Sequence, residues 1–165
     1  MSESHTTAAL TQRYASVVVG TDFSPCSAIA VEQAIRIAAW SGAPLHVVHV
    51  VDTGVATELD AVLSEYVQGI QDKLVRDARH EWGELSAGIP GAASLPIEVS
   101  VNHRIVAILG HARKHKADLL VLGAFGDRRP DVGLGTVATA CVRKSMTDVL
   151  LVRDTQAGPF KVVVA

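Results

Sequence analysis

The sequence contains no apolar run long enough to cross a membrane, and aromatic residues make up only 4% of its 165 residues. A transmembrane helix needs about 20 consecutive apolar residues, so no membrane span is predicted. The 15 basic and 17 acidic groups give a net charge of −2, and the basic residues form no cluster. Because few aromatic side chains are available to stack on bases, the sequence also argues against a dedicated nucleic-acid-binding protein.

Cysteine is equally scarce, with only Cys26 and Cys141. Two cysteines cannot form a disulfide framework, and no apolar signal core precedes them. A chain of this length buries roughly two-thirds of its unfolded surface, so neither disulfides nor a structural metal is needed for stability. We therefore expect one globular domain in the reducing cytoplasm. Cys26 lies in the first turn of a predicted helix, which leaves a redox role open beside a plain packing role.

The chain divides into three segments. Residues 1–13 are rich in Ser and Thr and are predicted to be a flexible leader. Residues 14–153 carry the periodic apolar pattern of an α/β domain, and residues 154–165 begin as a linker with Gly and Pro. The final FKVVVA is similar to YASVVVG at 14–20. The tail is therefore interpreted either as the first strand of a truncated second copy or as an ordinary sixth strand.

Apolar runs predict strands, and the segments between these runs show the apolar periodicity of helices. The predicted strands are residues 17–19, 45–51, 97–101, 118–122 and 149–152, and the predicted helices are residues 24–41, 59–85, 102–115 and 135–145. Ser24 and Pro25 form a typical helix start, and Asn102 is a second candidate cap. Strands that alternate with helices need parallel crossover connections. The fold class is therefore α/β, a doubly wound parallel five-stranded sheet with helices on both faces.

Ligands of such sheets bind at the carboxyl ends of the strands, beside the first strand. This rule brings together the turn at Asp22, the end of the second strand at Val51 and the loop that begins at Gly123. The Asp22 carboxylate can serve there either as a cap of the turn or as an acceptor for a ribose or a base. Position alone leaves both roles open.

The loop after the fourth strand is rich in glycine and ends at a helix start. Its glycines let backbone amides approach an anion, and the helix start adds free donors; these residues are Gly123, Gly126, Gly133, Gly135 and Thr136. Arg128 and Arg129 could neutralise further charge. Asp127 and Asp131 would repel a triphosphate unless a divalent metal lies between them. The loop therefore indicates phosphate binding, although many such loops only solve a backbone problem.

Three motifs together resemble the universal stress protein family: GTDFSPCS after the first strand, HVVD at the end of the second, and DLLVLGAFG leading to GT before the last helix. The resemblance covers residues 14–153. The family's nucleotide-binding branch has nine residues between its second and third motif glycines, whereas this chain has eight between Gly126 and Gly135. The resemblance implies the strand order 3-2-1-4-5 and an ATP-binding domain.

By position, the resemblance implies that Asp22 contacts the nucleoside and that the backbone of Val50 reads the adenine edge. It implies that the ribose and phosphates of ATP are held by Gly123, Gly126, Gly135, Thr136 and the amide of Val137. Whether Mg²⁺ accompanies the ATP is left open by the resemblance. Family members also dimerise through the fifth strand, so 149–152 is expected to be an exposed edge that pairs in a homodimer or with a second, tandem domain.

Three functions follow from these observations. The leading one is a stress-associated regulatory module that binds ATP and dimerises with little or no turnover. The shortened loop leaves room for a nucleotide-free dimeric scaffold, and Asp127 or Asp131 leaves room for a slow Mg²⁺-dependent ATP hydrolase. No Walker lysine follows the glycines and no nucleophile with a base can be named, so no catalytic residue is assigned.

The histidines are expected to be structural. His111 and His115 lie one helical turn apart, which is a metal-compatible spacing. However, the pair lacks the Glu of an HExxH motif, no third ligand is evident, and the neighbouring lysines indicate a solvated face. His46 and His49 point to opposite faces of their strand, so they cannot pair. The sequence therefore predicts no metal site.

Overall fold

The computed structural model describes residues 13–52, 64–126, 133–153 and 163–164. In chain order the elements are β1 (Val17–Gly20), α1 (Pro25–Ser41), β2 (Leu45–Asp52), α3 (Ser64–Ala87), β3 (Ile97–Asn102), α4 (Arg104–Lys114), β4 (Leu119–Gly123), α5 (Thr136–Lys144), β5 (Asp148–Val152) and β6 (Val163–Val164). The sheet order is β3-β2-β1-β4-β5-β6, and all pairs among the first five strands are parallel. The predicted fold class and the order 3-2-1-4-5 are confirmed.

The sheet has one more strand than predicted. Val163–Val164 pairs antiparallel with Leu150 and Leu151 of β5. The expectation that 149–152 is an open edge is therefore wrong for these two residues, because β6 covers them. The sequence could not decide this point, since the same valine run suits a sixth strand or the start of a second copy. The second copy remains a prediction.

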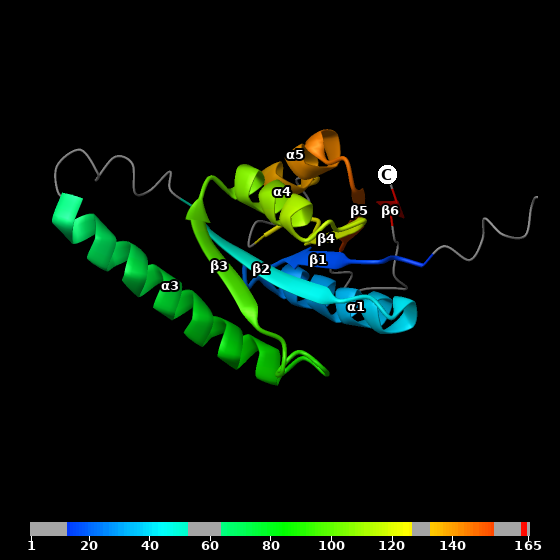
Figure 1. The fold of residues 1–165 in the computed structure, drawn as a ribbon, viewed down its shortest axis with the longest axis horizontal. Helices are drawn as coiled ribbons and strands as arrows, with labels where there is room; N and C mark the ends of the chain where they lie inside the picture. Colours follow the sequence, from blue (N-terminus) through cyan, green and yellow to red (C-terminus); the bar gives the residue numbers. More distant parts are fainter. Residues whose placement is uncertain (1–12, 53–63, 127–132, 154–162, 165) are drawn as a thin grey trace, which may run out of the picture.

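The sheet lies between two helical layers, with α4 and α5 on one face and α1 and α3 on the other (Figure 1). Successive side chains of a strand point to opposite faces, so the valine run of β1 supplies two cores at once. Val18 packs in the core under α4 and α5, whereas Val17 and Val19 pack in the core under α1 and α3. This double burial explains why the strand is uniformly apolar.

The helix boundaries follow from capping. Ser24 caps α1 by accepting a hydrogen bond from the Ser27 amide at 3.2 Å, and Pro25 occupies the first helical position, as predicted. Gly42 ends the helix with a left-handed φ of 71°. The predicted cap of α4 is wrong by one residue. His103 is the N-cap, and the side chain of Asn102 instead accepts the His103 amide at 2.7 Å.

Helix α3 is only partly a core helix. Its C-terminal half is buried through Ala78 and Trp82, whose indole nitrogen donates to the carbonyl of Leu95 at 2.9 Å. Ile70 and Leu74 are 47% and 40% exposed, so these two apolar side chains do not belong to the core. The N-terminal half extends past the end of the sheet (Figure 1). No helix in the described ranges has both the length and the apolar character to cross a membrane.

Both cysteines are buried free thiols. Cys26 packs beside Gly123, where an added Cβ would lie 3.3 Å from its sulfur, and its thiol donates to the carbonyl of Val152 at 3.1 Å. Burial raises the pKa of the Cys141 thiol to about 11. Since thiol chemistry needs an accessible thiolate, this burial supports the packing role for both residues.

The side chain of Asp118 anchors the two residues that precede β1. Its carboxylate accepts the amides of Ala15 at 2.8 Å and Ser16 at 3.0 Å. Burial raises the pKa of this carboxyl, but the backbone hydrogen bonds from Ser16 and Ala15 outweigh burial, so the pKa lies below its ordinary value. A lowered native pKa adds stability above the unfolded pKa, and that stability is lost as the pH falls through the native pKa.

Asp118→Asn is therefore expected to lower the free energy of unfolding by about 1–2 kcal/mol at neutral pH, because a charge-assisted acceptor is lost. The difference should shrink as the pH falls below about 4. Urea unfolding midpoints at pH 7 and pH 3 check this. Glu32→Gln, which removes an exposed pair with Arg36, is the control and should change stability by less than about 0.5 kcal/mol. An equal loss at both pH values would contradict the electrostatic explanation.

Candidate functional site

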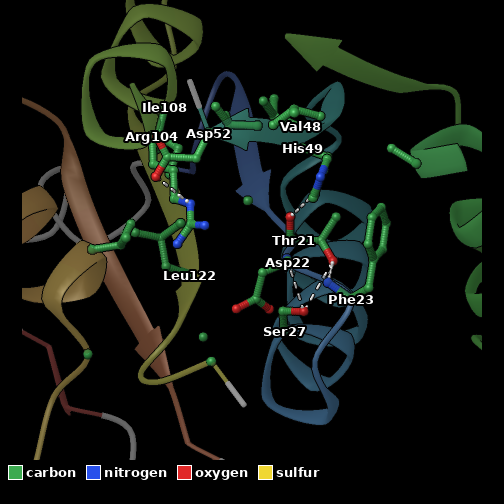
Figure 2. Close-up of a pocket in the computed structure, with 18 of the residues that line it drawn as sticks. Thr21, Asp22, Phe23, Ser27, Val48, His49, Asp52, Arg104, Ile108 and Leu122 are labelled. Carbon is green, nitrogen blue, oxygen red and sulfur yellow. Dashed lines mark hydrogen bonds and ion pairs between the residues drawn. The ribbon is translucent and has the colours of Figure 1, made fainter. Parts of the chain in front are cut away.

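A cavity of about 670 Å³ lies where the sheet reverses its strand order, at the carboxyl ends of β1, β2 and β4 (Figure 2). It is lined by all seven residues that the sequence predicted for a nucleotide site: Asp22, Val50, Gly123, Gly126, Gly135, Thr136 and Val137. The structure thus brings together residues more than 100 positions apart in the chain, as the rule for doubly wound sheets requires.

The β1–α1 turn forms one wall of the cavity and is held by side-chain hydrogen bonds. The hydroxyls of Thr21 and Ser27 are 3.1 Å apart, and Thr21 also accepts the amide of Phe23 at 3.1 Å. Phe23 has a φ of +64°, a left-handed conformation that costs energy for a bulky residue. These contacts fix a strained turn directly beside the cavity.

Asp22 performs one of its two predicted roles and is placed for the other. One carboxylate oxygen, Oδ1, accepts the amide of Ser24 at 3.1 Å and caps the turn. The other, Oδ2, faces Gly126, where an added Cβ would lie 2.6 Å from it. In Figure 2 the carboxylate projects from the turn into the open space of the site. One oxygen therefore remains directed at the cavity while the first stabilises the turn.

The glycine loop lies against this turn at contact distance. A Cβ on Gly123 would lie 3.2 Å from the Ser27 amide nitrogen, and a Cβ on Gly135 would lie 3.3 Å from the Ala124 carbonyl oxygen. The amide of Gly135 donates to that carbonyl at 2.7 Å. The absence of side chains at Gly123 and Gly135 thus permits this close packing.

The N-terminus of α5 supplies donors to the cavity. Thr139 makes the first intrahelical bond, to the carbonyl of Gly135 at 2.9 Å, so the three preceding amides lie in the turn whose donors have no intrahelical acceptor. Those residues, Thr136, Val137 and Ala138, all line the cavity. Free amides and the positive end of the helix dipole make this corner suited to an anion.

Arg104 and His49 are among the polar residues of the cavity that the sequence did not assign to the site. Arg104, the first residue of α4, pairs with Asp52 at 3.1 Å between its Nε and the carboxylate (Figure 2). His49 stacks on Phe23 with ring centroids 4.4 Å apart. The position of Arg104 just beyond the third predicted strand was an available signal, because all parallel strands end at this edge. His49 begins the HVVD motif at the end of the second predicted strand, so its position was an available signal too.

The environment of His49 favours the neutral form of its ring. Burial lowers the pKa of its imidazole and outweighs the bond to Thr21, which raises the pKa. Its Nδ1 lies 2.9 Å from the Thr21 carbonyl oxygen, so this nitrogen carries the proton and donates it. The ring therefore offers the cavity an uncharged aromatic surface.

Charge is unevenly distributed around the cavity. Asp77 and Glu81 line it from α3 beside Leu74, whereas the donors lie at the α5 end. An anionic group is therefore favoured near α5 and disfavoured near α3. The charged loop residues considered from the sequence (Asp127, Arg128, Arg129 and Asp131) lie outside the described residues, so the predicted roles of the two arginines and the Mg²⁺ hypothesis stay predictions.

The fold and the cavity define a doubly wound α/β domain with a cavity at its strand-order switch. The sequence model of the universal stress protein family matches residues 13–153. This chain belongs to the universal stress protein family, as its motifs predicted.

Known relatives agree with this assignment. Universal stress protein A homolog 1 of Coxiella burnetii (strain RSA 493 / Nine Mile phase I) is 26% identical over 141 residues, which cover 84% of this chain and 96% of that protein. Universal stress protein UspA from Lactobacillus plantarum is 28% identical, with a TM-score of 0.65 over 86% of this chain and 99% of that one. A universal stress protein solved in complex with cAMP is 32% identical, with a TM-score of 0.56 over 87% of this chain and 100% of that one.

Proposed function

We propose that this chain is a stress-associated regulatory module that binds ATP in the cavity and dimerises, with little or no turnover. The observation that carries the proposal is the meeting of Asp22 and Gly126 opposite the free amides of α5 in one cavity. The 32% identical relative that binds cAMP supports an adenine nucleotide as the ligand.

The cavity fits such a ligand. Its volume lies within the range of about 300–1,000 Å³ typical of small-molecule sites. In the proposed arrangement, the free oxygen of Asp22 accepts a ribose hydroxyl and the backbone of Val50 reads the adenine edge. The hydroxyl of Thr136 and the amide of Val137 donate to phosphates. Gly123, Gly126 and Gly135 leave the space that the ribose and phosphates need.

The proposed mechanism is a shift of population rather than chemistry. ATP that binds one arrangement of the loop or the dimer more tightly stabilises that arrangement by the difference in affinity. Mg²⁺ would supply charge neutralisation between the phosphates. Low turnover is proposed because no lysine follows the loop glycines and no nucleophile–base pair was identified in the sequence.

The proposal includes assembly through β5, with a second copy or with a tandem domain. Within the residues that the structure describes, the two residues of β6 pair with Leu150 and Leu151 of this five-residue strand. A longer partner strand would therefore offer more backbone hydrogen bonds than β6 does. We place the protein in the cytoplasm, where its two buried free thiols would remain reduced.

Thermal unfolding of nucleotide-free protein tests the proposal. Mg²⁺-ATP at about 100 times its dissociation constant should add roughly 2.7 kcal/mol, or about 5–10 °C in Tm at this chain length. ATP without Mg²⁺, cAMP and GTP are run beside it to define the ligand. Repeating the scan at two protein concentrations detects the dimer, whose Tm rises with concentration.

No shift with any adenine nucleotide at millimolar concentration would overturn ATP binding and favour the nucleotide-free scaffold. Steady release of phosphate, lost when Asp127 and Asp131 are both replaced by alanine, would favour the hydrolase instead.

A further inference from the structure

A second cluster of ligand-type side chains lies at the other end of the strands, under α4. It contains His46 near the start of β2, Glu98 near the start of β3 and His115 at the C-cap of α4. One potential ligand atom from each of the three lies within 4.8 Å of the others. We define these three residues as the His46 cluster. It involves none of the residues that line the nucleotide cavity.

The register of the sheet creates this cluster. Glu98 pairs with Val48, so its side chain shares a sheet face with His46, two residues earlier on β2. Helix α4 packs on that face and brings His111 and His115 over it. The expectation that these two histidines lie on a solvated face is wrong, since their side chains are only 12% and 15% exposed. Glu98 is the third ligand-type residue that the spacing alone did not reveal.

Ring nitrogens of His115 and of the neighbouring His111 lie close to the carboxylate of Glu98 but lack hydrogen bonds. Nε2 of His115 lies 2.6 Å from one oxygen of Glu98, and Nδ1 of His111 lies 3.5 Å from the other. Both nitrogens are buried, and neither has a hydrogen-bond partner of acceptable geometry among the described residues. Buried polar atoms of this kind call for an occupant that can be shared between ring nitrogen and carboxylate.

We propose that His46, Glu98 and His115 bind a divalent transition-metal ion of the zinc class. Two imidazole nitrogens and one carboxylate oxygen are a ligand set that zinc accepts, with the remaining position open to water. His111 completes the outer shell, because its Nε2 lies 3.2 Å from the Ser100 hydroxyl and its other nitrogen lies beside Glu98. Such outer contacts orient the ligands directly bound to a metal.

Metal binding would change two present contacts. The rings of His46 and His115 are stacked with centroids 3.7 Å apart. A ring nitrogen binds a metal in the plane of its ring, so both rings must rotate about their broad χ2 torsions. Lys114 also donates to Glu98 at 2.6 Å. Its ammonium is a competing cation, and its side chain is 62% exposed, so it can swing into solvent.

The pKa shifts of His46 and of the neighbouring His111 are compatible with a metal. Burial is the largest effect on the imidazoles of His46 and His111, and it lowers the pKa of both. Neutral rings keep the lone pair that a metal needs. The alternative occupant is a proton shared between His115 and Glu98.

The test is a titration of chelator-treated, nucleotide-free full chain with Zn²⁺ and with Co²⁺, followed by calorimetry and by visible absorption of Co²⁺. We expect one equivalent to bind. His115→Ala and Glu98→Gln should each weaken binding by about 100-fold, comparable to or greater than the loss caused by outer-shell changes. Lys114→Met should tighten binding, because it removes the competing ammonium.

His80→Ala is the matched control, because His80 forms an exposed i,i+4 pair with Glu84 and has no third ligand within the described residues. It should leave binding unchanged. Circular dichroism of the metal-free variants verifies folding, and His46→Gln provides a second variant if His115→Ala is unfolded. Equal Zn²⁺ binding by the wild-type protein and both folded ligand variants, or no binding at all, would overturn the proposal. Because the assay contains no nucleotide, neither result bears on ATP binding.

Discussion

Gly126→Val is expected to weaken ATP binding by about 100-fold, or roughly 2.7 kcal/mol. The first atom of the new side chain would lie 2.6 Å from Oδ2 of Asp22. That carboxylate cannot move freely, because its other oxygen caps the turn through Ser24. The variant must therefore displace either the loop or the one carboxylate oxygen that faces the cavity. Isothermal titration calorimetry with Mg²⁺-ATP measures the loss.

The control for this variant is Gly83→Ala in α3, where an added Cβ meets nothing within 4 Å. It should keep full affinity and gain about 0.5–1 kcal/mol of stability from helix propensity. A double-mutant cycle with Asp22→Ala isolates the clash. If the clash with Asp22 causes the loss of ATP affinity, the double variant should bind ATP about as weakly as Asp22→Ala alone. Unchanged affinity in Gly126→Val would show that the nucleotide does not depend on this contact.

Leu120→Ala is expected to lower the free energy of unfolding by about 2–5 kcal/mol. Leu120 is the second residue of β4 and is fully buried in the core under α4 and α5. Rigid strands flank it on both sides, so the surrounding structure can relax only slightly into the space left behind. The loss is a large part of the roughly 5–15 kcal/mol that stabilises a domain of this size. Urea unfolding at 25 °C measures it.

Val106→Ala on α4 is the matched control, because its side chain is 56% exposed. Its change in stability should stay within about 0.5 kcal/mol. Leu120→Ala should still bind Mg²⁺-ATP with unchanged affinity wherever it is folded, since its side chain does not line the cavity. A small destabilisation, similar to that of the control, would mean that the core repacks around the gap.

The sheet could be predicted from the sequence because its strands are buried on both faces. A run such as Val17, Val18 and Val19 has few stable alternatives to a central strand, and Ser24 with Gly42 marks where α1 begins and ends. β6 could not be predicted with the same certainty. A short valine run at the end of the chain carries no information about which edge it pairs with.

The candidate cavity was predictable for a related reason, since glycines and turn residues at strand ends are local signals. The His46 cluster was not predictable, because Glu98 meets His115 only through the register of β3 and the packing of α4. The exposure of Ile70 and Leu74 on α3 could not be predicted from the sequence either. Periodicity shows which side of a helix is apolar, whereas the length of the underlying sheet determines how much of that side is covered.

Helix α4 begins in one site and ends in the other. Arg104 at its first residue lines the candidate cavity, and His115 at its C-cap belongs to the His46 cluster. A helix of 11 residues is a stiff rod roughly 16 Å long, so an axial displacement at one end reaches the other end undiminished. If a ligand at either end moves this rod, thermodynamic reciprocity requires each ligand to change the affinity of the other by the same factor. One short helix would then let a change in metal supply alter how firmly a nucleotide is held.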